Sequence, residues 1–342
     1  MKTATRLPAC IPLLIATLAF LSLSSESSAQ KITAQGKGGG WSMSGTNPIQ
    51  LHWGGEHVTT YQTGDQYAKP FFYPLMGPTG ENITRHWPQK EGVEGEAEDH
   101  PHHRGMWFGL GSVNGYDFWH EPASGKKPKP FGKIVHLGMG GMSFSGNVGM
   151  IKVRSEWQGM DDKKKIMNDE REFRFEKLEN GTMIVDAKIT LKATAGDVTI
   201  HDDKEGAWSI RVMPTLRIEG EVANGSIVNS SGIEGKAAWG KRANWVDYYG
   251  PDTAGRTIGV AILDHPSNLR HPTWYHARHY GLFTANPFGQ GNFEKETKKG
   301  AGDYTIKNGD SLSLNYRTIF HLGDAKAAKI DEAYKAWAAE KK

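Results

Sequence analysis

The chain has 342 residues, 23% of them charged, and a formal net charge of only +3. A charge this small excludes the strongly basic surface that nucleic-acid binding requires. The one cysteine, Cys10, lies close to the N-terminus, so no later residue can supply a thiol for a disulfide, a nucleophile or a cysteine metal site.

The N-terminal segment, residues 1–29, has the pattern of a secretory signal peptide. Lys2 and Arg6 precede an apolar stretch over residues 7–23, and small residues follow up to Ala29, after which we expect cleavage. The apolar stretch is short for a membrane span and contains two prolines, and no later segment reaches the length of a span. We therefore expect a periplasmic or secreted protein without an integral membrane span.

Residues 30–44 contain the glycine run Gly36 to Gly40 and are predicted to be a flexible lead-in. Residues 45–342 show no repeat and no low-complexity linker, which favours a single domain. Within it, residues 182–194 alternate apolar and polar side chains, the pattern of a half-buried strand. Similar alternation predicts further strands within residues 150–157, 170–178, 208–220 and 311–322.

Two turn signals separate apolar runs, Asn180–Gly181 and Asn308–Gly309, and both predict hairpins. Helical spacing is convincing only at the C-terminus, where Ile330, Tyr334 and Trp337 recur and Asp324 can cap the helix. Many strands, abundant glycine and one terminal helix predict an all-β fold, an antiparallel β-sandwich with a C-terminal helix.

Histidines gather in two short windows of the chain. Eight of the 14 histidines lie there: His100, His102, His103 and His120 in the first window, and His265, His271, His276 and His279 in the second. The intervening stretch at residues 238–251 adds aromatic and charged residues. We expect the three segments to form one site.

Strand geometry restricts the first window. In an extended chain, His100 and His102 point to one face and His103 to the other, so the three cannot share one centre without a bend. Pro101 removes a ladder hydrogen bond and favours such a bend. His102 and His103 are therefore stronger site candidates than His100.

Three roles are open for these imidazoles. As acid/base groups they suit chemistry near neutral pH. Glu121 would then orient an imidazole or act as a second acid/base group, and Arg104 would hold a carboxylate or an oxyanion. As ligands, histidines with a carboxylate suit a divalent metal, although no diagnostic metal spacing is present and no cofactor is assigned. The third interpretation is that they are satisfied polar residues in loops.

Aromatic residues beside polar ones indicate the class of ligand. Sugars present apolar faces and polar edges, so tryptophan beside charged side chains is typical of a carbohydrate surface. Trp119 and Trp245 are the better candidates for stacking on a sugar ring, whereas Trp107, Trp239 and Trp274 also suit a sandwich core.

Five stretches carry a resemblance to a known family: "FFYPLMGPTGENITRHWP", "DHPHHRGMWFGLGSVNGYDFWHE", "AWGKRANWVDYYGP", "VAILDHPSNLRHPTWYHARHYGLFTANPFG" and "FHLGDA". Together they closely resemble the PmoA-like domain-of-unknown-function family. The resemblance implies an exported bacterial protein of carbohydrate-degrading contexts without a settled reaction. Its motif positions correspond here to His102, His103, Arg104, Trp119, His120, Glu121, Trp239, Lys241, Arg242, Asp247, Asp264, His265, His276 and Asn286.

The strand pattern with a His/Arg motif and a later histidine also looks like the galactose-mutarotase supersandwich. That similarity implies sugar chemistry in which a histidine and a carboxylate handle protons, and it concerns architecture and residue types only.

The leading hypothesis is an exported carbohydrate-active enzyme that performs glycosidic cleavage or epimerisation, with a carbohydrate or glycoside as its partner. Its predicted catalytic residues are His102, His103, Arg104, His120, Glu121, Asp264, His265 and His276. The predicted substrate-binding residues are Trp119, Trp239, Lys241, Arg242, Trp245, Asp247 and Asn286. A non-catalytic carbohydrate-binding module and a histidine-ligated metal enzyme are the alternatives.

Overall fold

Strand β10 (Met183–Lys192) shows how the sequence pattern becomes a buried layer. Its alternate residues Met183, Val185, Ala187, Ile189 and Leu191 are all fully buried, while the residues between them are at least partly exposed. Because side chains alternate along a strand, the apolar face of such a strand packs onto a second sheet and the polar face meets water.

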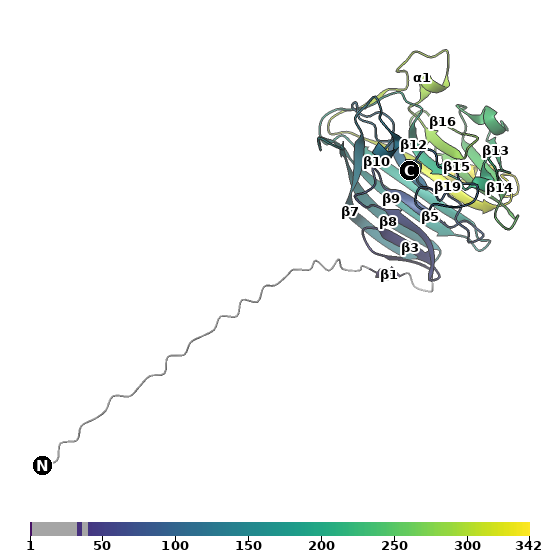
Figure 1. The fold of residues 1–342 in the computed structure, drawn as a ribbon, viewed down its shortest axis with the longest axis horizontal. Helices are drawn as coiled ribbons and strands as arrows, with labels where there is room; N and C mark the ends of the chain where they lie inside the picture. The colour runs from purple at the N-terminus through teal and green to yellow at the C-terminus, as the bar shows by residue number, and fades with distance from the viewer. Residues whose placement is uncertain (2–32, 36–39) are drawn as a thin grey trace. The chain divides into compact units, whose positions relative to one another are not determined.

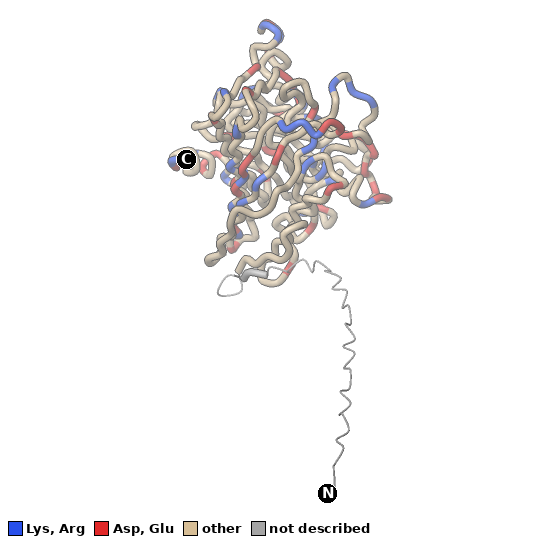
Figure 2. The backbone as a smooth tube through the Cα atoms, turned by 90° about the vertical axis from the view of Figure 1, so that its left-hand side faces the viewer, with Lys and Arg blue, Asp and Glu red and all other residues tan. Residues whose placement is uncertain are grey.

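The computed structural model describes residue 1, residues 33–35 and residues 40–342, and the predicted signal segment lies outside these residues apart from Met1. From Lys31 to the C-terminus the chain forms one compact unit built on two large antiparallel sheets (Figure 1). None of the described helices is long and apolar enough to cross a membrane. Basic and acidic residues are interspersed in the view of Figure 2, as the small net charge predicts.

The first large sheet has nine strands. Its order is β1 (Thr33–Gln35), β2 (Trp41–Ser44), β3 (Ile49–Trp53), β4 (Glu56–Gln62), β5 (Phe71–Leu75), β6 (Met106–Leu110), β12 (Gly206–Arg211), β17 (Leu282–Asn286) and β16 (Trp274–Tyr275).

The second large sheet has eight strands. Its order is β13 (Ser226–Asn229), β14 (Trp245–Pro251), β15 (Thr257–Asp264), β19 (Ser311–Leu322), β10, β9 (Lys165–Lys177), β8 (Val148–Gly159) and β7 (Gly132–Ser145). A small separate pair joins β11 (Val198–Ile200) to β18 (Tyr304–Ile306).

Among the described residues, helices are few and short. They are η1 (Pro122–Ser124), η2 (Pro214–Leu216), η3 (Gly235–Ala238), α1 (Gln290–Phe293) and α2 (Ile330–Ala338). The predicted all-β sandwich with a C-terminal helix is therefore confirmed.

The C-terminal helix α2 covers the outer face of the eight-stranded sheet. Its residues Ile330, Tyr334 and Trp337 are buried, as their helical spacing predicts, and they pack with Leu263 of β15 and Ile319 of β19. The predicted cap is wrong. Lys329 precedes the helix, whereas Asp324 accepts a hydrogen bond from the backbone N–H of Ala327 at 2.7 Å in the turn before it.

Three other predictions differ from the structure. The lead-in contains strands β1 and β2, because Trp41 is fully buried in the core and brings its strand into the sheet. The strand predicted over residues 208–220 ends at Arg211, since Pro214 begins η2. Asn180–Gly181 does join the hairpin of β9 and β10, but the strands on either side of Asn308–Gly309 pair with other partners.

The nine-stranded sheet buries side chains on both of its faces, and this positions the site. In β6, Met106 and Phe108 belong to the core between the sheets, whereas Trp107 points the other way and packs with Phe71 and Leu282 on the outer face. Loops that carry the first histidine window cover this outer face.

Candidate active site

The loop over residues 99–104 bends, as Pro101 predicts. His100 has a left-handed backbone with φ of 46°, and its carbonyl accepts a hydrogen bond from the N–H of His103 at 2.9 Å. The bend places the rings of His102 and His103 only 4.3 Å apart, centroid to centroid. An extended chain would have put them on opposite faces.

Arg85 holds this loop from beneath. Its Nη1 donates hydrogen bonds to the carbonyls of Ala97 and Asp99 and to the Asp99 carboxylate at 2.6 Å, and its Nη2 donates to the carbonyls of His100 and His103. The Arg85 side chain is only 2% exposed. Because these carbonyls have their donor from one rigid guanidinium, the loop is fixed before any ligand arrives.

His103 is held neutral in one tautomer. Arg211, which is fully buried, lies with its Nη1 3.1 Å from the Nδ1 of His103. Since a guanidinium can only donate, Nδ1 must accept, and the proton lies on Nε2. Burial, with the charges of His102 and Arg211, keeps the pKa of His103 well below its ordinary value.

His102 joins the two halves of the first window. Its Nδ1 lies 2.8 Å from the hydroxyl of Ser124, and its ring lies 4.4 Å from that of His120. Burial, followed by the charges of Lys69 and His120, lowers the pKa of His102 far below its ordinary value, so this ring is neutral.

Asp117 and His120 form a dyad. One Asp117 oxygen accepts the backbone N–H groups of Trp119 and His120 at 2.9 Å, and the other lies 2.8 Å from His120 Nδ1. A carboxylate accepts, so Nδ1 carries a proton and Nε2 of the neutral ring is free to take one. The His120 side chain is 20% exposed, which makes it reachable from solvent, unlike the buried His102 and His103.

Arg104 and Glu121 bind each other. Arg104 Nη2 donates to one Glu121 oxygen at 2.6 Å and Nε faces the other at 3.4 Å, so Arg104 does hold a carboxylate, but one from its own chain. Lys69, buried nearby, donates to the Trp119 carbonyl at 2.6 Å. Burial lowers the pKa of Lys69 to about 8, against the opposing charge of Glu121. In this structure Asp117, and not Glu121, orients an imidazole.

His276 of the second window lies on the same outer face. Its Nδ1 lies 3.0 Å from the Lys204 carbonyl, which fixes the proton on Nδ1 and leaves Nε2 as an acceptor. Burial lowers the pKa of His276 to about 4, against the charge of Glu205. Burial raises the pKa of Glu205, but His276, Lys204 and His120 outweigh it and hold that pKa below its usual value. Glu205 is therefore near enough to one imidazole of each window for their charges to affect its pKa.

Tyr280 makes a second connection between the windows. Its ring stacks on His100 at 5.2 Å, and the guanidiniums of Arg211 and Arg278 lie over it at 4.6 and 5.3 Å. The first window and the end of the second therefore meet at this ring.

Asp264 and His265 belong to a different cluster. Asp264 accepts from His271 Nδ1 at 2.8 Å, and His265 packs against Trp337 of α2 at 4.8 Å. Within the described residues, no recorded hydrogen bond, ion pair or ring contact joins either of them to His102, His103 or His120. This part of the second window fastens α2 to the end of β15.

The predicted substrate-binding residues are divided between several places. Trp239 contacts the His276 ring at 6.2 Å, and Asn286 Nδ2 donates to the Asp203 carbonyl at 2.9 Å, bracing the segment that carries Glu205. Trp119 is buried against Trp107, so its ring faces no solvent in this structure.

The remaining four have other partners or none. Trp245 is covered by α2, and Asp247 pairs with His321 at 3.0 Å inside the eight-stranded sheet. Arg242 donates to the carbonyls of Pro272 and Arg270 and stacks on Trp274, so it supports a loop. Lys241 is exposed.

Sequence reasoning missed Glu205, Arg85 and Arg211 as members of the site, and gave Asp117 no role. Asp117 had a local signal, because it lies three residues before His120. The others had none: Arg85 and Arg211 are single charged residues in ordinary stretches, and Glu205 ends the charged run Asp202–Glu205. Pairing of β12 with β6 and β17 brings Arg211 and Glu205 to this face, and the backbone of Arg85 bonds to that of Arg211.

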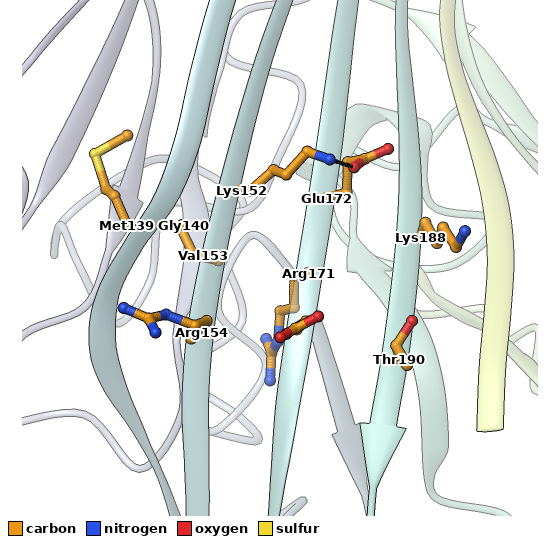
Figure 3. Close-up of a pocket in the computed structure, with 10 residues that line it drawn as sticks. Met139, Gly140, Lys152, Val153, Arg154, Arg171, Glu172, Lys188 and Thr190 are labelled. Atoms are coloured by element: carbon orange, nitrogen blue, oxygen red, sulfur yellow. Dashed lines mark ion pairs between the residues drawn. The ribbon is translucent and has the colours of Figure 1, made fainter. Parts of the chain in front are cut away.

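Surface hollows lie both at this site and away from it. One of about 230 Å³ lies beside the second window, lined by Lys236, Trp239, Ala277, Arg278 and His279. A larger hollow of about 580 Å³ lies on the eight-stranded sheet, where Lys152, Arg154, Glu172 and Lys188 project from β8, β9 and β10 and Lys152 pairs with Glu172 (Figure 3). Size does not locate the chemistry here, because the larger hollow contains no imidazole.

The described residues include no group of three or more His, Cys, Asp or Glu side chains arranged to hold a metal ion. The hydrogen bonds of the clustered imidazoles give a physical reason for this arrangement. His103 Nδ1 accepts from the guanidinium of Arg211, and Nδ1 of His120 and of His276 each faces an acceptor, so the three rings belong to separate polar networks.

Comparisons with known proteins give a family and distant structural similarities. No curated protein matches the sequence significantly. Similar solved structures include an alpha-galactosidase from Lactobacillus brevis, with 9% identity, a TM-score of 0.31, and coverage of 87% of this chain and 40% of that chain. A 4-alpha-glucanotransferase from Thermococcus litoralis has 10% identity, a TM-score of 0.26, and coverage of 85% and 39%. The chain thus spans well under half the length of each enzyme.

A GalM/aldose epimerase homologue from C. elegans is similar over 86% of this chain and 98% of its own length, with 10% identity and a TM-score of 0.27. Similarities at these TM-scores assign neither activity nor substrate. A model for a family of unknown function, DUF6807, matches residues 48–335, which run from β3 into α2 and include both histidine windows. The PmoA-like name stays a prediction. The chain belongs to the DUF6807 family.

Proposed function

We propose that the protein is an exported carbohydrate-active enzyme in which His120 transfers protons at a sugar hydroxyl or glycosidic oxygen. The observation that carries the proposal is the Asp117–His120 dyad, with a 2.8 Å contact on Nδ1 and Nε2 free on a partly exposed ring. A positioned histidine whose orientation a carboxylate fixes is a standard general acid/base arrangement.

Neighbouring groups supply the second half of such chemistry. Glu205 has a side chain 13% exposed and lies close enough to His120 and His276 for both to affect its pKa. The histidine accepts a proton at Nε2 in one step and, once protonated, can return it in the next, and a carboxylate kept ionised nearby can stabilise the protonated ring or accept a proton in turn. The reaction class that fits is proton transfer at one sugar carbon or its oxygen, as in epimerisation or glycosidic cleavage.

The surroundings support a sugar ligand. Trp239 forms one wall of the hollow beside His276, and indole rings provide apolar area together with a polar N–H.

The test is turnover by the purified protein on free aldoses, followed by NMR of the anomeric protons, and on chromogenic glycosides. We expect His120→Gln to reduce turnover by about 10²–10⁴-fold, the usual contribution of one acid/base group. His52→Gln is the matched control, because His52 lies on β3, which β4 and β5 separate from β6, the strand that precedes the dyad. Sugar binding with no turnover, unchanged in His120→Gln, would instead identify a non-catalytic binding module.

A further inference from the structure

The hollow of about 230 Å³ beside His276 contains polar donors that the chain itself does not satisfy. Trp239 Nε1 and Arg278 Nε are both buried and have no hydrogen-bond partner. Each of these atoms carries a hydrogen and can only donate. Because both atoms are buried in this structure, an occupant of the hollow satisfies them only where a small movement of these side chains exposes them, and it must then offer acceptors.

Arg278 also has no counter-ion. Among the described ion pairs, the two other basic residues of the hollow share one carboxylate, since Glu219 pairs with Lys236 and lies 3.4 Å from His279 Nε2. No described pair includes Arg278. Arg278 is therefore the basic side chain of this hollow that forms no described ion pair.

The geometry of Arg278 prepares it for a planar anion. Its guanidinium lies over the Tyr280 ring at 5.3 Å, and Tyr280 is itself held between His100 and Arg211. The Tyr280 ring limits where the guanidinium can lie, and no described hydrogen bond occupies its two terminal NH₂ groups. These groups match a carboxylate, which they can bind through two parallel hydrogen bonds.

We infer that this hollow binds the carboxylate of an acidic sugar, a uronic acid, with Arg278 as its anion partner and Trp239 against the ring. The sugar in this inference rests on the proposed function, whereas the acidic group rests on Arg278 and the two unsatisfied donors. Trp239, which lines the hollow, also contacts the ring of His276, so a sugar bound in the hollow lies near that histidine. The protein then selects acidic over neutral saccharides.

The experiment is calorimetric titration of the full chain, at low salt, with glucuronate, galacturonate, glucose, galactose and glucose 6-sulfate. We expect at least one uronate to bind about ten-fold or more tightly than its neutral counterpart, and binding to weaken as salt is added. Arg278→Gln should weaken uronate binding by about 10- to 100-fold, the range for a lost hydrogen bond to a charged group. Arg278→Lys keeps the positive charge but cannot make two parallel hydrogen bonds, so its affinity for the uronate should lie between those of the wild type and Arg278→Gln.

Two further variants complete the design. Trp239→Phe removes the indole N–H but keeps an aromatic wall, and it should weaken uronate binding several-fold. Arg154→Gln removes the same charge from β8 on the other sheet and should leave binding unchanged. Thermal melting curves identify any variant that fails to fold. If Arg278→Gln does not fold, Arg278→Lys is compared with the wild type in its place.

Equal binding of uronates and neutral sugars, or no uronate binding at all, would overturn the inference. Tighter binding of the sulfate than of both uronates would overturn the carboxylate assignment. An unchanged preference in Arg278→Gln would overturn the role of Arg278. Equilibrium binding decides these points, whereas the proposed function stands or falls on turnover in His120→Gln, so the two failures are distinguishable.

Discussion

The Asp117–His120 dyad yields a prediction that does not require the substrate to be known. In Asp117→Asn, the amide oxygen can still accept the backbone N–H groups of Trp119 and His120, which Asp117 accepts at 2.9 Å. The NH₂ group then faces His120 Nδ1, where the wild-type carboxylate accepts at 2.8 Å. Two donors cannot share that contact, so the neutral ring must move its proton to Nε2.

The magnitude follows from the single contact that changes. A hydrogen bond to a charged group contributes about 1.5–3 kcal/mol. The free-energy difference that favours the Nδ1-protonated tautomer of His120 should therefore fall by about that amount in Asp117→Asn. Converted to a rate, the same energy reduces turnover by about 10- to 150-fold. The fold should survive, because the loop keeps its backbone hydrogen bonds.

The assay is ¹⁵N NMR of the histidine rings above neutral pH. In the wild type we expect a protonated Nδ1 and an unprotonated Nε2 for His120, and the reverse in Asp117→Asn. Asp161→Asn, in an exposed turn, is the matched control and should leave the His120 signals unchanged. An unchanged tautomer in Asp117→Asn would refute the dyad and the role assigned to His120.

Three other predictions concern stability. Arg85→Gln should lower the free energy of unfolding in urea by about 3–5 kcal/mol, because it removes a buried cation that donates to four carbonyls and to the Asp99 carboxylate, which keeps Arg211 as its other partner. Arg154→Gln should change the free energy of unfolding by less than about 0.5 kcal/mol, and similar losses in the two variants would refute the role of Arg85 in holding the loop. Because burial lowers the pKa of His276 to about 4, the unfolded chain binds an extra proton below pH 6.5, so stability should fall by about 3 kcal/mol between pH 6.5 and 4. His276→Gln should reduce the dependence of the unfolding free energy on pH in this range. An equally steep dependence in the variant would contradict the lowered pKa of His276. Trp337→Ala should lower the free energy of unfolding by about 3–5 kcal/mol, because the buried indole of Trp337 packs α2 onto the sheet. A melting temperature unchanged from wild type would show that α2 contributes little to stability.

Local patterns in the sequence predicted much of the architecture. Alternation in β8, β9, β10 and β19, and helical spacing in α2, each depend on neighbours within a few residues. The same local logic failed where Pro214 ended a strand and where Asp324 capped a turn ahead of α2.

The candidate site was predicted in part. His102, His103 and His120 do lie together, since they come from one stretch that turns over one sheet face, and His276 and His120 are each near enough to Glu205 to affect its pKa. Asp264 and His265 could not be separated from that group by sequence, because their neighbours in the chain are as polar and aromatic as those of His276.

Composition, periodicity and the spacing of Asp117 and His120 determined the all-β class, the terminal helix and the first half of the site, because all of these act over short stretches of chain. The tertiary structure alone decided which distant charges meet those histidines. Pairing of β6 with β12 and of β12 with β17 brings Glu205, Arg211 and His276 to one face. That pairing selects the tautomers of the imidazoles and leaves Arg278 without a partner, through contacts between residues far apart in the chain.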